Sequence, residues 1–163
     1  MAKASAFDVF RLAERIELAT AGLYREVGER FPWSPEERQV LKSLEDEEHQ
    51  HASRVRLFRA RYLADGALFD LTALKLEPLE ALERDTEELL ARVVAGAFAG
   101  DHLRLKRCLY DLEDRASIAH AEVMAAGAHP AVARFMLALA DQDRAHRDLL
   151  LHFCEGRPSP AGA

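Results

Sequence analysis

Glu48-His49-Gln50-His51 places a carboxylate and an imidazole three residues apart in a segment with helical periodicity. Residues three apart lie on one side of a helix, so both side chains point from the same face. A weaker copy, Asp143-Arg144-Ala145-His146, follows in the second half of the chain. Each copy is preceded, at nearly the same distance, by a glutamate on another apolar stripe, Glu17 or Glu113. The repeat indicates a duplicated helix pair, with the two halves facing each other across a pseudo-twofold axis.

Six ionisable side chains on apolar stripes need opposite charges or hydrogen-bond partners when they are buried. Each unpaired buried charge costs several kcal/mol, whereas a whole domain is stable by only about 5–15 kcal/mol. Two divalent cations would balance four carboxylates and leave the histidines as neutral ligands. Such a ligand set, projecting inward from four helices, is typical of a dinuclear metal site. The predicted ligands are Glu17, Glu48, His51, Glu113, Asp143 and His146. The alternative is that some of them lie at a wet bundle edge and pair with arginines.

The ligand types favour iron, or manganese, over structural zinc. Carboxylate and imidazole suit these metals, and no Cys-x-x-Cys motif is present, because Cys108 and Cys154 stand alone. Tyr24 and His120 lie one helical repeat beyond the glutamates of the first and third long helices. We expect them to hydrogen-bond the ligands, with core packing as the alternative. Asp143 is one methylene shorter than Glu48, which predicts a weaker second half-site.

Apolar periodicity predicts four long helices. Ser34, Pro35 and Glu37 form a capping box that begins the second helix, and Asp101 can cap the third. The expected spans are Ser5–Phe31, Ser34 to about Tyr62, Asp101 to about Ala126, and near Pro130 to just before Gly156. Residues 67–100 form a long crossover, with a shorter helix from about Thr86 to Ala95 and Asp85 with Glu88 as its capping pair. The predicted fold is an all-α, antiparallel four-helix bundle over residues 1–155, with a flexible tail at 156–163.

Composition suits one domain, since 163 residues with 49% hydrophobic content fit a single core. The net charge is −6 and the charges are mixed along the helices, so no nucleic-acid footprint is expected. No signal-like segment or membrane-length apolar run occurs, which favours a cytoplasmic protein without membrane contact. The first helix carries a second apolar stripe, and we therefore expect a homodimer or a larger assembly. The stripe comprises Val9, Leu12, Ile16, Ala19 and Leu23.

The sequence resembles the di-iron domain of the rubrerythrin branch of the ferritin-like superfamily. The resemblance covers roughly residues 6–154 and is carried by the segments Arg15–Tyr24 and Asp46–Ala52 and their second-half counterparts. It implies a four-helix bundle with a long connection after the second helix and two irons bridged by carboxylates. It also implies a ligand arrangement, in which Glu17 and His51 hold one iron, Glu113 and His146 hold the other, and Glu48 and Asp143 reach between them.

The resemblance implies a di-iron oxidoreductase, a peroxidase or ferroxidase that reduces hydrogen peroxide or oxygen as ferrous iron is oxidised. Three departures bear on this expectation. There is no rubredoxin-like module, so electrons would come from a separate donor. Ala116 replaces an extra glutamate, which leaves a six-ligand set nearer to that of ferritins, and Asp143 replaces a glutamate. The alternatives are a non-catalytic iron-binding or iron-storage protein and a di-iron hydroxylase.

Overall fold

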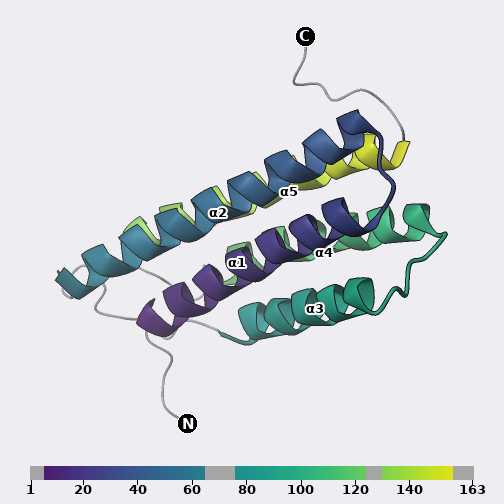
Figure 1. The fold of residues 1–163 in the computed structure, drawn as a ribbon. Helices are drawn as coiled ribbons and strands as arrows, with labels where there is room; N and C mark the ends of the chain where they lie inside the picture. Colours follow the sequence, from purple (N-terminus) through teal and green to yellow (C-terminus); the bar gives the residue numbers. More distant parts are fainter. Residues whose placement is uncertain (1–5, 65–75, 124–129, 156–163) are drawn as a thin grey trace.

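Helices account for nearly all of the described chain. The structure is a computed structural model, and it describes residues 6–64, 76–123 and 130–155. Within these ranges there are five helices and no strand (Figure 1). The helices are α1 (Ala6–Arg30), α2 (Pro35–Ala64), α3 (Glu77–Val94), α4 (His102–Glu122) and α5 (Pro130–Glu155). The predicted all-α class is confirmed, and the four long helices lie where the apolar periodicity places them.

The long helices form two pairs. α1 packs along α2, and α4 packs along α5, with the two helices of each pair running in opposite directions (Figure 1). α2 also contacts α5, and α3 packs against both α1 and α4. One continuous core of buried apolar side chains joins all five helices. The two pairs therefore face each other, and the polar stripes of the long helices meet between them.

Local capping explains where two of these helices begin. The Glu37 amide donates to Ser34 Oγ at 3.1 Å, and the Ser34 amide donates to the Glu37 carboxylate at 3.0 Å. This is the predicted capping box, and it satisfies two amides that the helix itself cannot pair. The Asp101 side chain accepts from the Arg104 amide at 3.1 Å at the start of α4. Both predicted caps are confirmed.

The predicted start of the crossover helix is wrong. α3 begins at Glu77 and includes Pro78 in its first turn, where a residue without an amide hydrogen loses no hydrogen bond. Asp85 and Glu88 therefore lie inside the helix and do not cap it. Thr86 is fully buried, and its hydroxyl donates to the Leu82 carbonyl at 2.9 Å. Pro78 therefore marks the first turn of this helix.

α3 also explains the second apolar stripe of α1. Four of the five stripe residues are buried within this single chain, and the apolar side of α3, from Leu79 to Val93, joins the same core. An ion pair of 2.5 Å between Arg15 and Glu83 links the two helices where they meet the solvent. The stripe therefore gives no reason to expect a second subunit, and the homodimer stays a prediction without that support.

Three predicted features lie outside the described residues: the end of the third long helix at Ala126, the first part of the crossover, and the tail at 156–163. The described part of α4 ends at Glu122, with Val123 as its C-terminal cap. Among the described helices, none combines the length and the apolar character that crossing a bilayer requires.

Candidate metal centre

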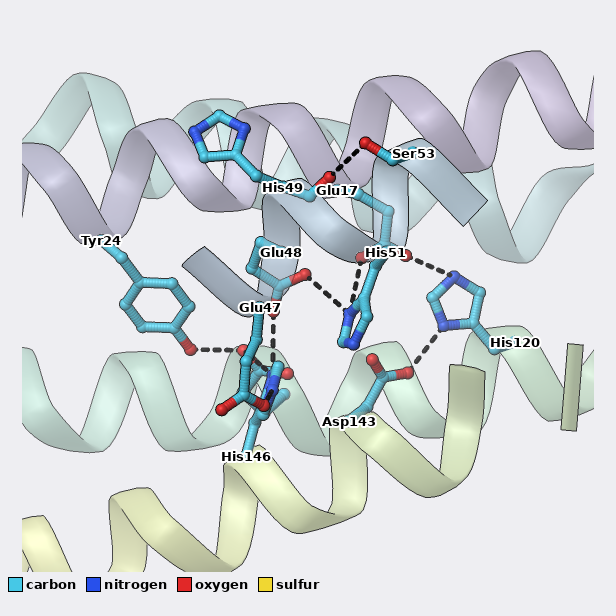
Figure 2. A network of polar contacts seen from close by, with 11 residues as sticks. Glu17, Tyr24, Glu47, Glu48, His49, His51, Ser53, His120, Asp143 and His146 are labelled. Atoms are coloured by element: carbon cyan, nitrogen blue, oxygen red, sulfur yellow. Dashed lines mark hydrogen bonds and ion pairs between the residues drawn. The ribbon is translucent and has the colours of Figure 1, made fainter. Parts of the chain in front are cut away.

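The polar side chains singled out in the sequence meet between the two helix pairs. All eight are at most 2% exposed, although they are ionisable or phenolic. They come from α1, α2, α4 and α5 (Figure 2). The eight residues are Glu17, Tyr24, Glu48, His51, Glu113, His120, Asp143 and His146. The inward orientation predicted from the apolar stripes is confirmed for every one of them.

Glu48 lies between two imidazoles. Its Oε2 atom is 3.3 Å from His51 Nδ1, and its Oε1 atom is 2.9 Å from His146 Nδ1 (Figure 2). The two rings are stacked, with centroids 5.3 Å apart and planes 15° from parallel. One ligand atom from each of these three side chains lies within 4.8 Å of the other two. This group could therefore hold a metal ion.

The separations match those of atoms that share an ion. Two ligands each about 2.1 Å from one metal are about 3.0 Å apart at a right angle and about 3.4 Å apart at the tetrahedral angle. The Glu48 contacts fall in this range, as does the 3.4 Å between His51 Nδ1 and Glu17 Oε2. His146 Nδ1 has no hydrogen-bond partner despite its 2.9 Å approach to Glu48. This geometry is expected if the Nδ1 lone pair is directed at an ion and not at a hydrogen-bond donor.

Tyr24 holds Glu113 in place. The phenol on α1 donates a hydrogen bond to Glu113 Oε1 on α4, and the same oxygen is 3.8 Å from His146 Nδ1. Burial raises the pKa of Tyr24 further above its usual value, so the hydroxyl stays protonated as a donor. The prediction that Tyr24 hydrogen-bonds a proposed ligand is confirmed.

His120 contacts two further carboxylates. Its Nδ1 atom is 2.6 Å from Asp143 Oδ2, and its Nε2 atom is 3.7 Å from Glu17 Oε1 (Figure 2). The predicted hydrogen bond between His120 and a proposed ligand is confirmed at Asp143. The resemblance implies that Asp143 reaches between the two ions, and its short contact with His120 is an arrangement that the spacing along the chain does not predict.

Glu47 belongs to the centre, although the sequence pattern does not single it out. Its Oε2 atom lies 3.0 Å from His146 Nε2, while its side chain remains 46% exposed. A carboxylate on the outer nitrogen of an imidazole fixes the tautomer and directs the inner nitrogen toward a metal. The only sequence signal was its place in the acidic run before His49, and helical periodicity puts it on a neighbouring face.

Removing this support is expected to weaken metal binding. Glu47→Ala should lower the affinity for one ion by about 10- to 100-fold, since the His146 imidazole loses its orienting carboxylate. Competition of Mn²⁺ or Co²⁺ with a chromogenic chelator measures the change. Asp46→Ala is the matched control, because Asp46 is exposed and pairs with Lys42 instead. Equal affinities in the two variants would show that Glu47 has no such role.

In the metal-free protein, protons balance the buried carboxylates. Burial disfavours the charged form of His51 and so lowers its pKa. The hydrogen bonds and negative charges of Glu17 and Glu48 have the larger, opposite effect and raise the pKa of His51 to about 10. Burial raises the pKa of Glu17 to about 7. Asp143 likewise outweighs the effect of burial and raises the pKa of His120 to about 9. The centre therefore keeps imidazolium ions where a metal would otherwise supply the positive charge.

A cavity of about 10 Å³ lies inside the cluster. This volume is close to the minimum that one water molecule needs. The polar residues that line it are Glu17, Thr20, Glu48, Glu113, His120 and Asp143. A larger, open groove beside Trp33 contains none of them and lies at the protein surface.

The donor set is one of oxygen and nitrogen atoms from side chains. Carboxylates and imidazoles bind divalent iron and manganese, and both free cysteines, Cys108 and Cys154, are half-buried elsewhere on α4 and α5. Comparisons of the chain with protein-family models, curated proteins and solved structures found no match. The chemistry of the centre is therefore inferred from its own side chains.

Proposed function

We propose that the chain is a ferritin-like four-helix bundle of the rubrerythrin type, a di-iron oxidoreductase that reduces hydrogen peroxide or oxygen as ferrous iron is oxidised. The observation that carries this proposal is the position of Glu48 between His51 and His146, with both carboxylate oxygens facing an imidazole nitrogen. A separate donor would return the electrons. Two antiparallel helix pairs with a long connection between them support the proposed bundle.

The glutamates divide the cluster into two half-sites. Glu17 approaches His51 at 3.4 Å, and Glu113 approaches His146 at 3.8 Å. Glu48 presents one oxygen to each half-site and is therefore suited to bridging two ions. Buried ligands of this kind fit two divalent cations, since the carboxylates supply the compensating negative charge.

Bound iron would supply one-electron chemistry and an exchangeable position for a small oxidant. The chain's own residues would shape the environment of that chemistry. Tyr24 holds Glu113 through a hydrogen bond across the helix pairs, and Glu47 holds His146. Burial of all the proposed ligands excludes bulk water from the centre, and the cavity has room for about one molecule of the size of water.

Rapid mixing tests the proposed reaction. The ferrous-loaded protein, prepared without oxygen, is mixed with hydrogen peroxide or with oxygen, and iron oxidation is followed by absorbance. We expect oxidation by one of them to be much faster than that of free ferrous iron in the same buffer. Rates equal to those of free iron would contradict the proposal. Accumulation of many irons per chain would favour storage over turnover.

Metal binding is expected to release protons. Burial opposes the charge on His146, but its contacts with Glu113, Glu47 and Glu48 outweigh burial and raise its pKa, as occurs at His51. Both imidazoles are therefore protonated at neutral pH and must lose a proton to bind an ion. At least two protons should be released, and affinity should rise between about pH 6 and 8 by about tenfold per released proton per pH unit. Calorimetric titration in buffers of different ionisation enthalpy counts these protons, and a count below two would contradict the prediction.

A further inference from the structure

His120 is a third imidazole inside the cluster, and half of its hydrogen-bonding capacity is unused. The residue is 1% exposed, and its Nδ1 atom is 2.6 Å from Asp143. Its Nε2 atom has no hydrogen-bond partner, and neither does Glu17 Oε1, which lies 3.7 Å away. Both residues line the small cavity. Two buried, unpaired polar atoms that face one cavity indicate a missing partner between them.

We propose that His120 is a metal ligand, which binds through Nε2 the same divalent ion as Glu17 and His51. The assignment rests on the dinuclear centre proposed above and adds a third imidazole to it. Two ligands each about 2.1 Å from an ion and about 120° apart are separated by about 3.6 Å, close to the observed 3.7 Å. A borderline divalent ion such as Fe²⁺, Mn²⁺ or Co²⁺ accepts this mixture of nitrogen and oxygen.

Asp143 prepares the ring for this role. A hydrogen bond from Nδ1–H to the Asp143 carboxylate leaves Nε2 as the nitrogen that binds an ion once it has lost its proton. Glu47 acts in the same way on His146, with the two ring nitrogens exchanged. Each of these imidazoles therefore has one nitrogen held by a carboxylate and the other directed into the cluster.

Glu17 joins this imidazole to the rest of the centre. Its Oε2 atom faces His51 Nδ1 and its Oε1 atom faces His120 Nε2, so its carboxylate lies between the two rings (Figure 2). At the corresponding place in the other half-site, Tyr24 donates a hydrogen bond to Glu113. A protonated phenol is a donor and does not offer a lone pair to a metal as an imidazole does. The half-site of Glu17 is therefore richer in nitrogen and binds its ion more tightly.

Proton NMR of the Co²⁺-loaded protein tests the assignment, because ring N–H signals of ligating histidines shift far outside the normal range. Histidine labelled with ¹⁵N in the ring identifies these signals. We expect three histidines with shifted ring signals in the wild-type protein and two in His120→Gln. Affinity for one Co²⁺ should fall about 100-fold or more in that variant. His49→Gln, at a histidine that is 51% exposed on α2, should retain all three.

The outcomes separate this inference from the proposed function. Binding of two Co²⁺ ions with only two shifted histidines in the wild type would overturn the role of His120 and leave the dinuclear centre intact. No Co²⁺ bound at the centre would overturn both. The count in the wild type decides the question even where His120→Gln fails to fold.

Discussion

Converting Glu48 and His51 to glutamine in the same chain is expected to abolish binding of at least one of the two ions. Glu48 is the carboxylate that faces both His51 and His146, so its loss removes an oxygen ligand from each half-site. The loss of His51 then leaves the half-site of Glu17 without its closest imidazole nitrogen. Metal analysis after equilibration with Mn²⁺ or Fe²⁺ and removal of free ions measures the stoichiometry.

Asp46→Asn combined with His49→Gln is the matched control for this double variant. It makes the same chemical changes on the same helix, at side chains that are 54% and 51% exposed. We expect the control to bind as many ions as the wild type. Two ions retained by Glu48→Gln with His51→Gln would remove the basis of the metal assignment.

Metal loading is expected to raise the unfolding temperature by about 8–16 °C. An ion present at about 1,000 times its Kd stabilises the folded state by about 4 kcal/mol, and each kcal/mol shifts Tm by about 2–4 °C in a chain of this size. The physical reason is that the ion replaces protons as the positive charge that balances the buried carboxylates. Circular dichroism during heating, with Mn²⁺ or with a chelator, measures the shift.

The variant that combines Glu48→Gln with His51→Gln serves as the comparison for the effect of metal on the unfolding temperature. Its unfolding temperature should respond weakly to Mn²⁺, since its ligand set is incomplete, whereas the exposed Asp46 and His49 control should respond as the wild type does. A wild-type protein whose unfolding temperature is the same with Mn²⁺ and with a chelator would contradict the prediction.

The long helices and the inward side chains could be predicted because both depend on local pattern. Glu17 and Glu113 fall on apolar stripes with a period of a helix, and the amides at Ser34 and Glu37 find partners within four residues. The prediction of where α3 begins was wrong, because Pro78 is compatible with either the interruption of a helix or its first turn. Packing of α3 against α1 and α4 selects the helix, and that contact is not visible in local sequence.

The contacts inside the centre could be predicted only in part. Which carboxylate meets which imidazole depends on the depth and angle at which helices cross, and a spacing along one helix does not fix either. Glu47 is the clearest case, since it reaches across from α2 to His146 on α5 although it flanks the apolar stripe. The pairing of His120 with Asp143 likewise joins α4 to α5 at a position set by their packing.

An anaerobic titration with ferrous iron tests the dinuclear centre most directly. The metal-free protein is titrated without oxygen, free iron is removed, and iron and protein are quantified in the same sample. Saturation is expected at two irons per chain, because Glu48 faces two imidazoles that each have a glutamate of their own. Saturation at one iron per chain, or no retained iron, would contradict this expectation.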